Sequence, residues 1–178
     1  YLHFELARAL YRGKRGADFL ALTQIYRTLL TAPDLNAQSR VFYAYNFLQD
    51  AHEVLPSATE RKKIIEAMLK AKPGKEVISL LNAEMAVLDL ISAADEKAEA
   101  TAFSLLNKLL SETRNDYFLR RAFYTRAIVN FAEATKVKYL GVVARNWLRY
   151  TTREDTEFAY AREAFADNSL AQAYVHME

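Results

Sequence analysis

Residues that could carry chemistry are few and widely spaced in this 178-residue chain. It has no cysteine, and its three histidines are His3, His52 and His176. A zinc site needs several thiolate or imidazole ligands at short spacings, and a Ser–His–acid triad needs a histidine beside its nucleophile. No two histidines lie four residues apart, and no Glu-x-x-His motif of di-iron bundles occurs. We therefore expect no metal centre, no cofactor and no nucleophilic catalysis.

One closely spaced pair of glycines, Gly13 and Gly16, flanks Lys14 and Arg15. A phosphate-binding loop needs a longer glycine pattern, with a strand before it and a helix after it. The pair lacks both the spacing and the strand, so we interpret it as a turn between two helices. With the sparse histidines, this predicts that the protein is not an enzyme.

Aromatic side chains are abundant, with 11 Tyr, 10 Phe and 1 Trp. They crowd two segments, Phe42–Phe47 and Tyr117–Phe131. The first of these spans more than one face of a helix, so at least one of its aromatic rings should be exposed. An exposed ring can anchor a binding partner, since it buries much area for little conformational entropy. The alternative is that all these rings fill the seams between helices.

Charge is unevenly distributed, although the net charge is only +2. Residues 114–153 contain nine basic and two acidic residues. The block before them, 74–113, has three basic and seven acidic residues, and the block after them, 154–178, has one and six. Such a basic block can steer an acidic partner. It can equally pair with its acidic neighbours inside the fold. From charge alone, the candidate partner-binding residues are Arg120, Arg121 and Arg126.

The elements that must position these side chains are helices. Apolar pairs recur at helical spacing, as in Leu105–Leu106 followed by Leu109–Leu110. Four such quartets begin at Ile25, Ile64, Leu105 and Val143, so their spacing is nearly constant. A constant period of about 40 residues is typical of stacked helical repeats. Pro33 and Pro73 share this spacing and would end two of the helices. The expected helices are 2–12, 17–31, 36–54, 58–71, 75–93, 96–112, 116–134, 137–150, a weaker 155–165, and 167–178.

Both ends of the chain resemble tetratricopeptide repeats. The first helix of that repeat carries a large residue, then a small one, then another large residue three positions after the small one. Leu170-Ala171-x-x-Tyr174 and Leu6-Ala7-x-x-Leu10 fit this pattern. Ala21-x3-Ile25-x2-Thr28-x4-Pro33 keeps the spacing of the second helix. The period of this chain is longer than that of the family, which is about 34 residues.

The resemblance implies an all-α fold, a right-handed α-solenoid of stacked antiparallel helix pairs. The quartet spacing gives this solenoid a period of about 40 residues. We expect residues 1–178 to form one such array, cut from a longer chain with further repeats at its C-terminal end. Matching the end units to the family implies that the groove-lining residues are Arg8, Tyr11, Arg12, Asn168, Gln172 and His176. No apolar run approaches the length of a membrane span, and the cytoplasm and the bacterial periplasm both remain open.

The function expected from this resemblance is a non-enzymatic scaffold for protein–protein interaction. A protein or peptide would bury apolar groups against aromatic rings on the concave face, and arginines would hold its acidic groups. One alternative is a structural spacer or oligomerisation arm in a large bacterial secretion, export or envelope assembly. Another is an RNA-binding helical repeat, since arginine with interleaved tyrosine also suits RNA.

Overall fold

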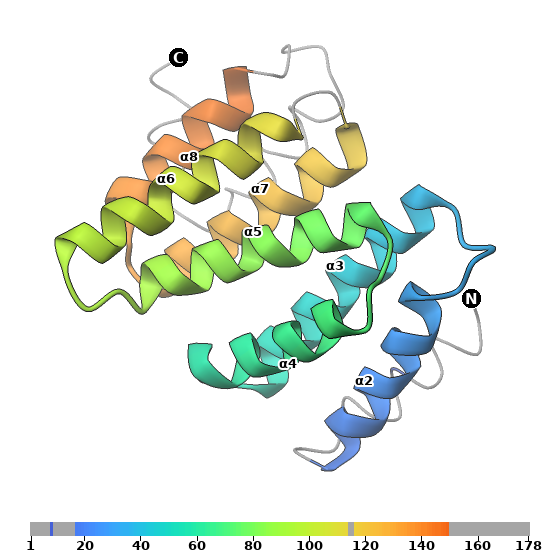
Figure 1. Cartoon of the computed structure of the whole chain (residues 1–178). Coiled ribbons are helices and arrows are strands. Elements are labelled where there is room, and N and C mark those ends of the chain that lie inside the picture. Colours follow the sequence, from blue (N-terminus) through green and yellow to red (C-terminus); the bar gives the residue numbers. More distant parts are fainter. Residues whose placement is uncertain (1–7, 9–16, 114–115, 150–178) are drawn as a thin grey trace. The chain divides into compact units, whose positions relative to one another are not determined.

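The computed structural model describes residue 8, residues 17–113 and residues 116–149. Within these segments it contains seven α-helices and no strand, which confirms the all-α prediction (Figure 1). The helices are α2 (Ala17–Leu30), α3 (Ala37–Val54), α4 (Ala58–Lys70), α5 (Lys75–Ile91), α6 (Glu96–Glu112), α7 (Tyr117–Glu133) and α8 (Val137–Arg149). The expected bounds differ most at the end of α5, predicted at 93 and found at Ile91. Arg8 is helical, and the rest of 2–12, with 155–165 and 167–178, lies outside the described residues.

Side-chain caps start four of the helices. Asn36, Ser57, Asp95 and Asp116 each accept a hydrogen bond from the backbone N–H three residues later. These bonds satisfy one of the donors that the first turn of a helix leaves open. Ser57 also donates to the Glu60 carboxylate at 2.8 Å, which stabilises the start of α4 further. The polar breaks between the apolar stretches therefore fix where these helices begin.

Helix α7 ends in a left-handed turn. Thr135 has φ 54°, a conformation that β-branched residues rarely adopt. The N–H of Lys136 bonds to the carbonyl of Phe131 at 2.9 Å, the 6→1 bond of a Schellman motif. Lys72, directly before Pro73, also has φ 54° and donates its N–H to the carbonyl of Leu69 at 3.0 Å, but Pro73 has no N–H for a 6→1 bond. The chain is thereby reversed twice without glycine at the turning position.

The chain divides into two compact units, Tyr1–Met85 and Ala86–Glu178, called unit 1 and unit 2 below. In unit 1, α2 packs on α3 through the buried side chains of Leu22, Tyr26, Phe47 and Ala51. In unit 2, α7 packs on α8 and on α6. Its core includes Leu106, Phe131, Val143 and Trp147, which are all fully or almost fully buried.

Arg40 joins the two proline turns of unit 1. Its guanidinium donates to the carbonyls of Ala32 and Pro33, each at 3.2 Å. The same side chain covers Gly74, where an added Cβ would lie only 3.0 Å from Arg40 Cδ. The turn before α3 and the turn before α5 are therefore neighbours, which is consistent with the repeat expected from the spacing of the prolines. The solenoid and its period stay predictions.

Two kinds of helix alternate within the units. Helices α4 and α6 each bury one stripe, with Arg61, Ile65 and Met68 on α4 and Ala102, Leu106 and Leu110 on α6. Helices α3 and α7 bury side chains around most of their circumference. At about 100° per residue, the ten buried residues of α7 cover nearly every direction. This alternation of an enclosed and an outer helix makes the architecture repeat-like.

Substituting Trp147 tests the packing of unit 2. It is fully buried and stacks on Tyr124, with ring centroids 5.5 Å apart and planes inclined by 11°. We expect Trp147→Ala to lower the free energy of unfolding by about 3–5 kcal/mol, because the neighbours cannot fill the space of an indole. Urea unfolding measures this. Lys108→Ala, on the exposed side of α6, should change it by less than about 0.5 kcal/mol. A Trp147→Ala cost below about 1 kcal/mol would contradict the packing.

Candidate protein-binding surface

The structure places the predicted binding residues in different environments. Arg120 and Arg121 are half-buried on α7, whereas Arg126 on the same helix is only 3% exposed. Each of the three already interacts with other groups of the chain. The side chain of Arg8 is 12% exposed and is turned onto Asp50. The remaining candidates lie outside the described residues: Tyr11, Arg12, Asn168, Gln172 and His176.

Asp50 is the centre of a polar site that the sequence did not reveal. It is fully buried on α3 and accepts hydrogen bonds from Arg8 and from the Tyr26 hydroxyl, the latter at 2.6 Å. The spacing of Asp50 from the aromatic residues of α3 could have predicted this site. Asp50 follows Phe47 by three residues and Tyr43 by seven, which places it on the buried face of α3. A carboxylate on the buried face of a helix predicts a cationic partner, because burying a lone charge is too costly.

Exposed aromatic rings occur in both crowded segments. On α3, Phe42 is 42% exposed and meets Tyr43 edge to face at 5.4 Å. This confirms the expectation that at least one ring of Phe42–Phe47 would be exposed. On α7, Phe118 is 43% exposed and meets Tyr117 edge to face at 5.2 Å. Most of the other aromatic side chains of these two helices are buried in the seams.

Phe118 belongs to an apolar face with a basic border. Val129, 39% exposed, lies eleven residues after Phe118. That spacing is three turns, so both side chains point in nearly the same direction, about 16 Å apart. Arg121, one turn after Phe118, borders this face, whereas Arg120, two residues after Phe118, lies on the other side of α7. We call Phe118, Arg121 and Val129 the α7 patch. It combines exposed apolar area with a cationic side chain, which suits an amphipathic, acidic ligand.

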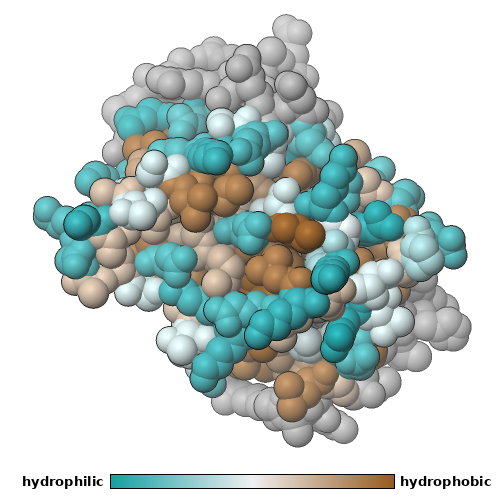
Figure 2. All heavy atoms as spheres, in the orientation of Figure 1, coloured by the Kyte–Doolittle hydropathy of each residue, from teal (hydrophilic) through white to brown (hydrophobic). Residues whose placement is uncertain are grey.

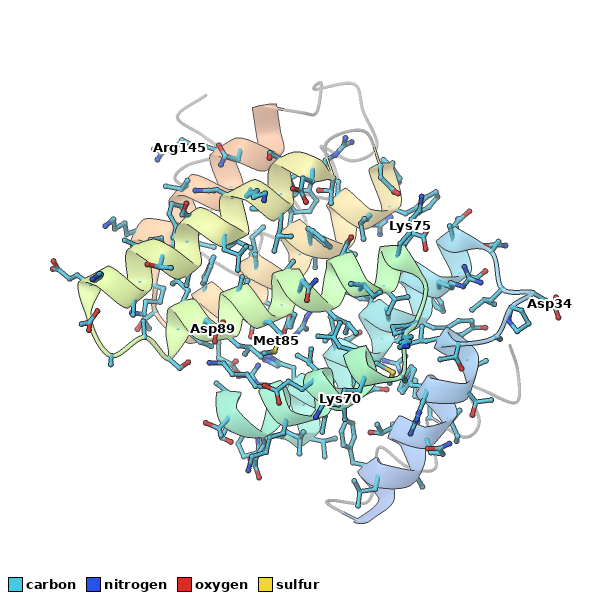
Figure 3. All side chains as sticks on the ribbon, in the orientation of Figure 1. Asp34, Lys70, Lys75, Met85, Asp89 and Arg145 are labelled. Carbon is cyan, nitrogen blue, oxygen red and sulfur yellow. The ribbon has the colours of Figure 1, made fainter. Side chains whose placement is uncertain are left out.

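The surface shows the same mixture more widely. In Figure 2, apolar atoms form patches bordered by hydrophilic side chains rather than one continuous apolar area. Arg145, on α8, is exposed and extends away from its helix (Figure 3). Lys138 is exposed seven residues earlier, so the two cations share the outer face of α8.

One member of the basic block is paired inside unit 2. Lys136, at the turn between α7 and α8, donates to the Glu99 carboxylate of α6, which also accepts from the Tyr139 hydroxyl at 2.9 Å. These hydrogen bonds, from Lys136 first and Tyr139 second, hold the pKa of Glu99 below its ordinary value. Burial, followed by the hydrogen bond to Glu99, raises the pKa of Tyr139. At this position the acidic and basic blocks pair within the fold.

The described segments contain neither a cluster of metal ligands nor a helix suited to span a membrane. Nowhere in them do three or more acidic, histidine or cysteine side chains gather as metal ligands would. None of the seven helices has both the length and the apolar character needed to cross a membrane. Compared with known proteins, the chain matches no family model, no curated protein and no solved structure. Any inference about function must therefore start from the surface itself.

Glu99 gives unit 2 a defined dependence on pH. Because its pKa is lower in the folded than in the unfolded chain, the ionised carboxylate stabilises the fold above its ordinary pKa of 4.5. This stabilisation disappears as the pH falls through the lower, folded value. We expect Glu99→Gln to unfold at lower urea concentration than wild type at pH 7, and the difference to shrink as the pH falls below 4.5. Urea midpoints measured between pH 7 and pH 3 test this.

The control is Glu112→Gln, which removes an exposed carboxylate near the other end of α6. It should shift the midpoint little at any pH. A Glu99→Gln difference that stays constant from pH 7 to pH 3 would show that the charge of Glu99 does not stabilise the fold.

Proposed function

We propose that this chain is a non-enzymatic helical-repeat scaffold that binds a protein or peptide through apolar and acidic groups. The α7 patch is the observation that carries the proposal, because exposed Phe118 and Val129 lie on the same side of α7 as the half-buried Arg121. Exposed apolar side chains with a polar or charged border are typical of protein interaction sites when they form a patch. The tetratricopeptide-like solenoid is part of this proposal.

The binding mechanism follows from the side-chain types. A partner's apolar group would cover the Phe118 ring, which is already fixed by its edge-to-face contact with Tyr117. A ring held in place loses little conformational entropy on binding. The guanidinium group of Arg121 would then hold a carboxylate by charge-assisted hydrogen bonds. Arg126 is too deeply buried for this role unless α7 is uncovered.

Reversing the charges of Arg120 and Arg121 near the start of α7 tests the proposal. The wild-type chain is used to capture partners from an extract, and a captured protein is purified for titration. Arg120→Glu with Arg121→Glu should raise its dissociation constant about tenfold or more, through lost attraction and new repulsion. Phe118→Ser should weaken binding independently of salt. Arg126 is left unchanged, since reversing a buried charge would destabilise α7.

The matched control is Lys63→Glu with Lys70→Glu, which reverses two exposed cations on α4. This variant has the same change in net charge but leaves α7 intact, so it should bind like wild type. Thermal unfolding of every variant shows whether the fold is kept. Equal binding by the Arg120→Glu/Arg121→Glu variant and wild type would remove the α7 patch from the proposal.

The pairing of Lys136 with Glu99 supports a second candidate, a structural spacer or oligomerisation arm. If the basic block serves mainly to hold neighbouring helices together, no acidic partner is needed. A self-associating arm would change its sedimentation coefficient with concentration in the micromolar range, whereas the scaffold would not. The RNA-binding alternative would show affinity for homopolymer RNA that falls steeply with salt.

A further inference from the structure

A forked polar interaction in unit 1 joins a residue before α2 to the buried face of α3. Arg8 Nε donates to both Asp50 oxygens, at 3.0 and 2.8 Å, and Arg8 Nη2 donates to Oδ1 at 2.8 Å. The Asp50 side chain has no exposed surface, and that of Arg8 is 12% exposed. Arginine thus presents two adjacent nitrogens to one carboxylate, a fork that an ammonium group cannot reproduce.

The acceptor side of this contact is built by α2 and α3. Tyr26, on α2, donates its hydroxyl to Asp50 Oδ2 at 2.6 Å and so holds the carboxylate from another side. Tyr26 is itself fully buried and packs edge to face on Phe47, with ring centroids 5.4 Å apart. Since α2 and α3 pack directly on each other, the positions of Asp50 and Tyr26 are determined without Arg8.

We propose that Asp50 and Tyr26 form a guanidinium-binding site, which Arg8 fills within the same chain. The ligand class is a planar cation with two adjacent N–H donors, as presented by arginine or an alkylguanidinium. Because the acceptor groups belong to packed helices, the site persists when the Arg8 side chain is removed and takes such a ligand from solution. Arg8 then acts as an intramolecular ligand that fastens the segment before α2 to α3, rather than as a contact for a partner.

The proposal is tested by chemical rescue of the full chain carrying Arg8→Gly. This variant removes the guanidinium and leaves space beside Asp50. Addition of n-propylguanidinium chloride should raise its thermal midpoint by several degrees, with a saturable dependence at millimolar concentrations. Wild type, whose site is filled, should show no such rise. Equal concentrations of n-propylammonium chloride keep the charge and ionic strength but lack the fork, and should rescue far less.

A second variant separates specific binding from general stabilisation. Arg8→Gly with Asp50→Asn keeps the shape of the site but removes its charge, so n-propylguanidinium should no longer raise the midpoint. An equal rise in both variants, or no saturable rise in Arg8→Gly, overturns the proposal. If Arg8→Gly does not fold alone, it is refolded from urea with and without n-propylguanidinium. Recovery of folded protein only with the ligand supports the site, and no recovery in either case overturns it.

Discussion

Helices α3 and α7 carry buried side chains around most of their circumference, and this constraint shapes both units. A helix of this kind cannot have most of its surface in water, because many of its apolar side chains would then be exposed. It must be enclosed by neighbours that each contribute one apolar stripe. Helix α8 does this for α7 with Tyr139, Val143 and Trp147 on one face and Lys138 and Arg145 on the other. The alternation of enclosed and outer helices follows from this difference in pattern.

Enclosure has a second consequence, because polar groups on the central helices can find partners only inside the protein. Asn46 Nδ2 on α3 and Thr125 Oγ1 on α7 have no hydrogen-bond partner, whereas other buried polar groups do. Asp50 receives Arg8 and Tyr26, and Asn130 donates to the carbonyl of Arg126 at 2.8 Å within α7. The Asp50 bonds join residues 24 and 42 positions apart, so they fix which segments meet and in what register. Apolar packing tolerates small shifts between helices, whereas a forked hydrogen bond does not. The buried polar groups therefore specify the arrangement that apolar burial stabilises.

The positions of the helices could be predicted from the sequence, but the burial of their individual side chains could not. Asn36, Ser57 and Asp116 cap helices where local rules place them, because capping depends only on neighbouring residues. Counting charge put Arg121 and Arg126 in one group, although one is half-buried and the other 3% exposed. The five positions that separate them rotate the side chain by about 140° around α7. Which directions are covered depends on neighbouring helices, and the helix sequence does not contain that information.

The residues of the basic block differ in what they offer to a partner. Lys136 is engaged by Glu99, and Arg126 is enclosed, so neither adds to the charge that an approaching partner would meet. Arg121, which also interacts within the chain, differs in its position, because it lies one turn after the exposed ring of Phe118. Charge at a surface gives attraction at long range, but affinity needs apolar area that binding removes from water. Within the described part of the basic block, exposed apolar area and a cationic side chain occur together along α7. Their combination supports a binding role more directly than the net charge of the block does.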